Sequence, residues 1–293
     1  MTTVTQARHY EGNAEAIEAW NGVLFDKFSR FRHIITAGLG AVGTVALARQ
    51  PPPRGARVVD LGCGFGDSTQ QIAELVGDRG EAVGVDAAAR FVETAAREST
   101  ERGIGNVAFR VADVQFDDLG GPYDYAFSRF GTMFFLSPVM AFRNVRRALR
   151  SGGPFVMAVW RKKEDNPWLK QAEDAVMEIV PLPQSTDEPT CGPGPFSLAS
   201  ADLVSTYLLT AGFRDVRLER FDAALRIGDS IADAIDFAMA LGPAGEIIRL
   251  AGEEGKRREP EVVAALERVL APYLRSDGVF APASTWIVSA QAD

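Results

Sequence analysis

Cysteine and histidine are scarce in this chain of 293 residues. The two cysteines, Cys63 and Cys191, lie far apart without a CxxC pair, and the only histidines are His9 and His33. Disulfide-stapled folds and zinc sites need several of these residues at short spacings. We therefore expect no disulfide framework, no metal site and a reducing, cytoplasmic environment.

An excess of basic residues and a long apolar run are missing as well. The formal net charge is −8, whereas surfaces that bind nucleic acid are basic. The longest apolar stretch, residues 34–48, is interrupted by glycines and is shorter than the roughly 20 residues that cross a membrane. No charged-then-apolar leader opens the sequence. We expect neither a nucleic-acid partner nor a membrane span, and we interpret residues 34–48 as a buried or cap helix.

Strand-like and helix-like segments alternate through much of the sequence, and 46% of the residues are hydrophobic. This alternation predicts an α/β fold, with a doubly wound, mainly parallel sheet and ligands bound outside the carboxyl ends of its strands. The expected strands are residues 57–61, 82–86, 107–113, 123–129, 154–160, 213–226 and 284–291. The expected helices are one apolar-striped helix from residue 14, then residues 67–76, 88–102, 137–150, 168–180 and 200–211, and about three helices between 229 and 275.

A proline-rich breaker at residues 50–55 indicates a boundary. The expected parts are an N-terminal helical extension at 1–50, frayed through residue 13, a ligand-binding core at 51–160, and a segment at 161–293 that completes the sheet, with a long loop at 181–195 and a helical cap at about 229–282.

The organising feature is a glycine-rich turn at residues 62–66, between a buried strand and a helix. Glycines let backbone N–H groups approach a ligand closely, and a helix N-terminus favours negative groups. A dinucleotide fingerprint needs a third glycine where Asp67 stands, so that template fails. Asp60, just before the turn, suits a ligand that carries an ammonium group.

Two more carboxylates end the second and third strands. Asp86 lies about twenty residues past the turn, where an acidic residue accepts hydrogen bonds from ribose hydroxyls; a helix N-cap is its alternative role. Asp113 can accept from an exocyclic amine such as adenine N6, while the Val114 N–H reads a ring nitrogen. Its alternative role is a solvated carboxylate at a strand end.

The end of the fourth strand, residues 128–131, lies beside the first strand in this interpretation. Its backbone can reach the amino-acid end of a ligand. Phe130, Met133 and Phe134 can wall the pocket, with ordinary core packing as the alternative. Together with the three carboxylates, this narrows the ligand to an adenosine that bears an amino acid.

Four short motifs occur in order: VVDLGCGFG at 58–66, VGVD at 83–86, VADV at 111–114 and LRSGG at 149–153. These motifs resemble those of class I S-adenosylmethionine-dependent methyltransferases, strongly over residues 55–160 and loosely elsewhere. The resemblance implies S-adenosyl-L-methionine as the cofactor. It also implies a Rossmann-like, doubly wound seven-stranded sheet with an antiparallel last strand, an N-terminal helical lid and a helical cap insertion. One departure is Ser151, where the family usually has proline.

A narrower resemblance is to bacterial small-molecule methyltransferases with an N-terminal Trp-Asn-Gly helix, here residues 20–22, and an Asn-Pro-Trp after the fifth strand, here residues 166–168. In that group the N-terminal helix closes over the cofactor. Trp20, Phe25 and Phe28 are therefore lid candidates, unless the stripe simply packs on the core.

The resemblance and the strand ends together give two sets of candidate residues. The expected cofactor-binding residues are Trp20, Asp60, Gly62, Cys63, Gly64, Gly66, Ser68, Asp86, Ala87, Ala112, Asp113, Val114, Ser128, Arg129 and Phe130. The expected substrate-pocket residues are Phe25, Phe28, Met133, Phe134, Trp160 and Trp168, to which the cap adds Phe237, Met239, Leu241 and Ile247 if it faces the acceptor. A folded appendage or a dimer surface is the alternative role of the cap.

We expect a cytoplasmic S-adenosylmethionine-dependent methyltransferase that acts on a small metabolite by in-line transfer, with a hydrophobic acceptor as the narrower expectation. No catalytic residue is assigned, because a base is needed only when the acceptor must lose a proton. A non-catalytic S-adenosylmethionine-binding regulatory or assembly protein is the alternative, and a nicotinamide-dependent reductase is disfavoured by Asp67. The expected partner is a small-molecule methyl acceptor, and a homodimer is left open.

Overall fold

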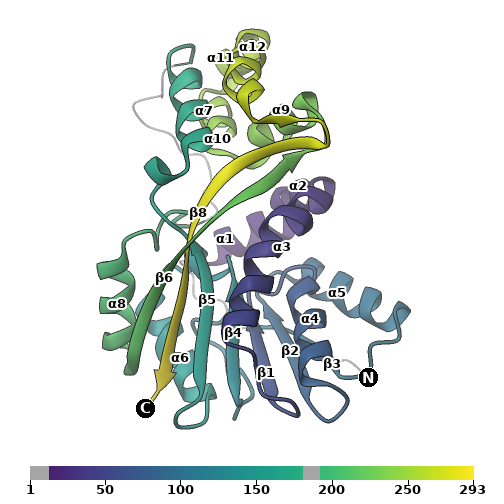
Figure 1. The fold of residues 1–293 in the computed structure, drawn as a ribbon, viewed down its shortest axis with the longest axis vertical. Helices are drawn as coiled ribbons and strands as arrows, with labels where there is room; N and C mark the ends of the chain where they lie inside the picture. Colours follow the sequence, from purple (N-terminus) through teal and green to yellow (C-terminus); the bar gives the residue numbers. More distant parts are fainter. Residues whose placement is uncertain (1–12, 181–191) are drawn as a thin grey trace.

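The computed structural model describes residues 13–180 and 192–293 and has an α/β fold built on one sheet (Figure 1). The expected frayed start and loop fall almost entirely outside the described residues, as do His9 and Cys191. The strands are β1 (Arg57–Leu61), β2 (Glu81–Asp86), β3 (Val107–Val111), β4 (Tyr125–Arg129), β5 (Pro154–Trp160), β6 (Phe213–Gly228), β7 (Leu274–Arg275) and β8 (Gly278–Ala292).

The strand order is β3-β2-β1-β4-β5-β8-β6, and the short β7 pairs with β8. Strands β1 to β5 are parallel, and β8 is antiparallel to both β5 and β6. The expected antiparallel last strand is thus confirmed, but the described sheet has eight strands rather than seven, because the two-residue β7 turns back onto β8. The chain order reverses between β1 and β4, where open α/β sheets bind their ligands.

Helices cover both faces of the sheet because successive strand residues point to opposite sides. Val58 and Tyr125 pack with α3 and α4 in one core, whereas Val59 and Ala126 pack with α6 and α8 in another. Full burial of a valine such as Val58 or Val59 contributes roughly 1.5–3 kcal/mol. These helices, with α5, are α3 (Arg32–Arg49), α4 (Asp67–Val76), α5 (Ala89–Glu101), α6 (Pro138–Ala148) and α8 (Ala201–Thr210).

Strands β6 and β8 continue beyond the sheet as a two-stranded ribbon that carries a lobe of helices, at the top of Figure 1. The lobe has its own core, in which Trp168, Ile235 and Leu266 pack with Ile227 and Val279 of the ribbon. Four helices follow β6, rather than about three. The lobe helices are α7 (Pro167–Met177), α9 (Ile231–Leu241), α10 (Pro243–Leu250), α11 (Gly252–Arg257) and α12 (Glu259–Leu270).

The N-terminal segment is not the single helix that its apolar stripe predicts. It consists of α1 (Ala14–Ala19), a π-helix (Trp20–Leu24) in which Gly22 has non-helical angles, α2 (Phe25–Arg30) and then α3. Residues 14–30 and 32–49 meet at 88°. The bend arises because the two halves bury their apolar sides on different surfaces: Trp20 packs on Phe134, whereas α3 lies on the sheet.

Within the described chain, no helix by itself has the length and apolar composition needed to cross a membrane, and only this bent pair passes that test when joined.

The glycines of α3 let it approach the ribbon closely. A Cβ atom on Gly38 would lie 2.7 Å from the backbone oxygen of Arg226 in β6, nearer than packing permits. The interpretation of residues 34–48 as a buried helix is confirmed, since Ile34, Val42 and Leu47 are all buried.

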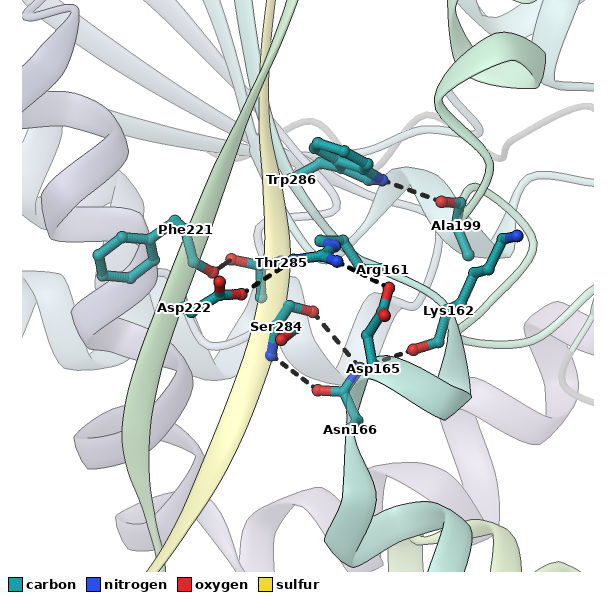
Figure 2. A network of polar contacts seen from close by, with 10 residues as sticks. All are labelled: Arg161, Lys162, Asp165, Asn166, Ala199, Phe221, Asp222, Ser284, Thr285 and Trp286. Carbon is teal, nitrogen blue, oxygen red and sulfur yellow. Dashed lines mark hydrogen bonds and ion pairs between the residues drawn. The ribbon is translucent and has the colours of Figure 1, made fainter.

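A polar network joins the end of β5 to the ribbon and the lobe (Figure 2). Asn166, which is fully buried, donates through Nδ2 to the backbone oxygens of Lys162 (3.0 Å) and Ser284 (3.4 Å), and its Oδ1 accepts from the Ser284 N–H (2.8 Å). It therefore links the segment before α7 to β8.

Arg161 completes this network. Its guanidinium pairs with Asp165 at 3.0 Å and with Asp222 at 3.1 Å, and it lies over the ring of Trp286. The asparagine of the Asn-Pro-Trp motif thus has a structural place at the base of the lobe.

We predict that Asn166→Ala lowers the free energy of unfolding by about 1–3 kcal/mol, because it removes the fully buried Asn166 amide and leaves the half-buried Ser284 N–H without its acceptor. Urea unfolding measures the change. Glu164→Ala, at an exposed neighbouring position, is the matched control and should change stability by less than about 0.5 kcal/mol. Equal stabilities of the two variants would contradict the assignment.

Candidate functional site

A cavity of about 180 Å³ lies at the carboxyl ends of β1, β2 and β4. The turns that follow these strands form its floor, and the N-terminal segment covers it with Trp20, Phe28 and Arg32. The position agrees with the ligand site predicted from the alternation of strands and helices.

The glycine turn after β1 has a backbone that requires glycine. Gly62, Gly64 and Gly66 have φ angles of 65°, 54° and 78°, in the left-handed region that disfavours other residues. A Cβ atom on Gly62 would also lie 2.9 Å from the Cα of Gly131, in the turn after β4. The two turns therefore touch, and they leave backbone exposed to the cavity where side chains would fill it.

Asp86 lies at the end of β2 and lines the cavity. Its Oδ2 accepts from the Gly64 N–H (3.0 Å) and its Oδ1 from the Ala88 N–H (2.9 Å). Burial raises the pKa of this carboxyl above its ordinary value. A carboxylate has about four lone-pair sites, so two remain for a ligand's hydroxyls. Asp86 thus fixes the turn and can still bind a ribose.

Asp113 follows β3 and is also buried at the cavity. Its Oδ1 accepts from both the backbone and the side-chain nitrogen of Gln115, at 2.9 and 3.1 Å. Its Oδ2 accepts from Asn13 Nδ2 at 2.5 Å. An amide N–H₂ thus already occupies the position where an adenine amine is expected to bind.

Aromatic rings form the wall between the N-terminal segment and the core. Trp20 contacts Phe28 (5.2 Å between ring centroids) and Phe134 (4.9 Å) edge to face, and Phe91 at 6.4 Å. Phe25 packs behind them on Phe65 and Phe91. Such pairs contribute about 0.5–1.5 kcal/mol each beyond the area they bury, so they hold the segment in place.

Asp60 lies beneath the turn rather than in the cavity. It is 1% exposed, and its Oδ2 accepts from the hydroxyls of Ser68 and Thr69, both at 2.7 Å. Its Oδ1 has no hydrogen-bond partner among the described residues. Burial raises the pKa of Asp60 to about 6, although the hydroxyls and Arg129 oppose the shift.

Two arginines line the cavity. Arg32 of α3 pairs with Asp67 at 3.1 Å and with Glu98 at 2.8 Å, and its guanidinium lies over Phe65. Arg129, at the end of β4, forms no hydrogen bond or ion pair with the residues that the structure describes, and it packs against Gly40 and Gly43 of α3. Burial lowers its pKa below the ordinary value, an effect that Asp67 and Asp60 oppose.

The structure brings most of the predicted site residues together. Those that line the cavity are Trp20, Gly62, Cys63, Gly64, Asp86, Ala87, Ala112, Asp113, Val114, Arg129, Phe130, Phe28 and Phe134. Those that support it from behind without lining it are Asp60, Gly66, Ser68, Ser128 and Phe25, of which Ser128 donates to the Leu61 carbonyl oxygen at 2.8 Å.

The acceptor wall expected from Met133, Trp160 and Trp168 does not lie on this cavity. Met133 is in the core, where its sulfur accepts from the Trp160 N–H at 3.5 Å. Trp160 packs on Phe130 with ring centroids 5.2 Å apart. Trp168 begins α7 and is buried in the core of the lobe. We predicted a pocket role for Trp168 because it follows β5 closely in the sequence. That closeness does not show in which direction α7 leaves the sheet.

The lobe likewise stays away from the cavity lining. Ile247 is buried in the lobe core, and Phe237 contacts Phe31 edge to face, with ring centroids 5.6 Å apart. Met239 packs partly against that core, and Leu241 is half-buried. The lobe thus meets the N-terminal segment, and its residues do not line the cavity in the described structure.

Several lining residues escaped prediction. Phe91 and Gln115 follow Asp86 and Asp113 closely in the sequence, so their proximity to these predicted site residues was a usable signal. Asn13 and Arg32 had no such signal, because only the bend of the N-terminal segment brings them over the cavity.

Comparison with known proteins gives a consistent result. A family model described as a methyltransferase domain matches residues 53–202, just over half of the chain. A protein of Bacillus halodurans C-125 predicted to be a methyltransferase has a similar fold, with a TM-score of 0.55 at 13% identity over 86% of this chain and 99% of that chain.

Two curated relatives match parts of the sequence. The aklanonic acid methyltransferase of Streptomyces sp. strain C5 is 38% identical over 84 residues, 26% of this chain and 38% of that protein. A ubiquinone/menaquinone biosynthesis C-methyltransferase of Pseudomonas aeruginosa is 30% identical over 132 residues, 44% of this chain and 51% of that protein. The chain thus spans about half or less of the length of these relatives.

The raised pKa of Asp60 predicts a pH-dependent stability. In the folded protein the Asp60 carboxyl keeps its proton up to about pH 6, whereas in the unfolded chain it loses the proton near the ordinary value of 3.8. The contribution of Asp60 to the free energy of unfolding is therefore fully present at low pH and is lost as the pH rises from about 4 to above 6. Between about pH 4.5 and pH 7.5 the loss is about 2 kcal/mol.

Asp60→Asn should remove this loss. The unfolding free energy of the variant relative to wild type should rise by about 2 kcal/mol from pH 4.5 to 7.5, measured by urea denaturation. A pH-independent destabilisation caused by the asparagine side chain cancels, because only the change of this difference with pH is compared. A difference that does not change with pH would show that Asp60 does not carry a raised pKa.

Proposed function

Because the chain belongs to the class I S-adenosylmethionine-dependent methyltransferase family, we propose that it transfers a methyl group from S-adenosylmethionine to a small, hydrophobic acceptor. The observation that carries this proposal is the meeting of the glycine turn, Asp86 and Asp113 at one cavity.

The cavity fits the cofactor in three respects. The turn exposes backbone where a Cβ atom would collide, Asp86 keeps free lone pairs, and Asp113 already binds an amide N–H₂. In this proposal Asp86 holds the ribose, and Asp113 accepts from the adenine amine in place of Asn13. Asp60 then supports the glycine turn from beneath, through its hydrogen bond with Ser68 in the helix that begins at Asp67.

The acceptor is proposed to be small and apolar because much of the remaining lining is apolar, apart from polar residues such as Arg32 and Arg129. Ile35, Leu39 and Phe134 face the cavity, and the N-terminal segment closes it. The relatives' names point the same way, since they refer to aklanonic acid and to ubiquinone and menaquinone biosynthesis. A protein or nucleic-acid acceptor would need an open surface here.

When bound, the cofactor supplies a methyl group activated by the positive sulfonium. The protein's part is to position and enclose the reactants. The glycine turn and the carboxylates orient the cofactor. This orientation favours a near-attack geometry and so lowers the barrier to methyl transfer. Trp20, Phe28 and Phe134 exclude water and present aromatic faces to a cation.

We also propose the division expected from the sequence: residues 1–50 as a lid, 51–160 as the cofactor-binding core and 161–293 as the completion of the sheet with its cap. The separate cores of sheet and lobe and the cover formed by residues 13–39 support it.

The proposal predicts turnover, not only binding. Incubated with S-adenosylmethionine and a small-molecule metabolite extract, the protein should release S-adenosylhomocysteine, measured by mass spectrometry, and release should depend on the extract. Binding without release in any extract would favour the non-catalytic alternative. Binding of NAD(H) but not of S-adenosylmethionine in calorimetry would overturn the family's cofactor here.

Asp86→Ala should weaken binding of S-adenosylhomocysteine by about 10- to 100-fold, since about 1–3 kcal/mol is lost when buried polar partners are removed. Calorimetry measures the affinity, and Asp78→Ala, an exposed carboxylate, is the control. Because Asp86 also holds the turn, adenosine and 2′,3′-dideoxyadenosine should be compared. Only the ligand with hydroxyls should lose affinity specifically; equal losses would contradict a ribose contact.

A further inference from the structure

The cavity contains a guanidinium that forms no direct ion pair with a described residue, although Asp67 and Asp60 act on it from a distance. Arg129 is half-buried and lines the cavity. In residues 13–180 and 192–293, no carboxylate oxygen lies within 4.0 Å of its nitrogen atoms, and no acceptor is at hydrogen-bond distance. Arg32, on the same cavity, differs because Asp67 and Glu98 both pair with it.

Helix α3 is shaped to accommodate this side chain. A Cβ atom on Gly43 would lie 2.8 Å from Arg129 Cδ, and one on Gly40 would lie 3.3 Å from its Nη1. Larger residues at these positions would displace the arginine. The glycines therefore keep a path between α3 and β4, along which the guanidinium reaches the cavity wall.

The residue after Arg129 is held in a strained conformation. Phe130 has a φ of 57°, which is rare for a bulky side chain, and its N–H donates to the Ala158 carbonyl oxygen at 2.9 Å. Gly131 follows, and a Cβ atom there would lie 2.8 Å from the Leu61 carbonyl oxygen. Strain of this kind persists where the surroundings fix it, and it is concentrated at functional sites.

Burial outweighs the distant attraction of Asp67 and Asp60, so this guanidinium lacks a directly paired anion that would offset its lost hydration. Its neighbours on the cavity wall include the apolar Ile35, Leu39 and Phe134. We propose that Arg129 binds the carboxylate of a ligand in this cavity, through the paired N–H groups that match a carboxylate's geometry. This inference rests on the proposed function, and the carboxylate belongs either to the amino-acid end of the cofactor or to the methyl acceptor.

The first arm of the test removes the carboxylate from the cofactor product. S-adenosylhomocysteine and its decarboxylated analogue S-adenosyl-3-thiopropylamine are titrated by calorimetry into wild type and Arg129→Met, which keeps most of the apolar stem. If the cofactor supplies the carboxylate, the variant should lose about tenfold or more in affinity for S-adenosylhomocysteine. Its affinity for the decarboxylated analogue should stay unchanged.

The second arm uses protein saturated with S-adenosylhomocysteine. Benzoate and its neutral counterpart benzamide are titrated and followed by NMR. If the acceptor supplies the carboxylate, wild type should prefer benzoate by about tenfold or more, and Arg129→Met should lose that preference. Arg129→Lys should keep part of it, because lysine retains the charge but not the planar fork.

Two controls separate this role from a structural one. Arg79→Met, at an exposed position, should leave every preference unchanged. Arg129→Met should not lower the melting temperature of the ligand-free protein, because the arginine has no partner to lose.

The inference is supported if wild type prefers the carboxylate-bearing ligand of either pair, S-adenosylhomocysteine or benzoate, and Arg129→Met loses that preference. Unchanged preferences in both arms, or a lowered melting temperature as the sole effect, would overturn it. If wild type binds neither adenosyl ligand, the proposed function itself fails.

Discussion

The contact between the turns after β1 and β4 sets the geometry of the whole site. Gly62 and Gly131 approach so closely that neither can carry a side chain without moving the other turn. The turn expected to bind the cofactor and the segment of Arg129 and Phe130 are therefore fixed relative to each other. The edge of the sheet acts as a rigid base, and adjustment to a ligand must come from what covers it.

The covering structure is built in layers. The N-terminal segment touches the cavity directly, whereas the lobe of α7 and α9–α12 touches that segment. Arg30 pairs with Asp236 at 2.6 Å, and Phe31 contacts Phe237 edge to face. The N-terminal segment is therefore one direct route by which the lobe can influence the cavity, beside its links to β5 and β8 through Asn166 and Arg161.

The sequence predicted the base of the site better than its cover. The strands, the glycine turn and the carboxylates at the strand ends follow from local patterns, because each depends on neighbours close in sequence. The bend at Phe31 and the direction of α7 depend on tertiary packing between distant segments, which periodicity does not encode. Met133, Trp160 and Trp168 were therefore expected at the cavity, although they belong to other cores, whereas Asn13 and Arg32 were overlooked.

The place of β8 in the sheet has a consequence for how the protein is made. Residues 278–292 lie between β5 and β6, and β6 pairs with no other strand. During synthesis, the first five strands can assemble on the ribosome before β8 is made. In that interval β6 has been synthesised but is unpaired, and the lobe helices follow it along the chain. Long-range pairings of this kind form slowly and leave strand edges open to other chains. Nascent chains are thus most prone to aggregate through the open edges of β5 and β6 before β8 has been synthesised.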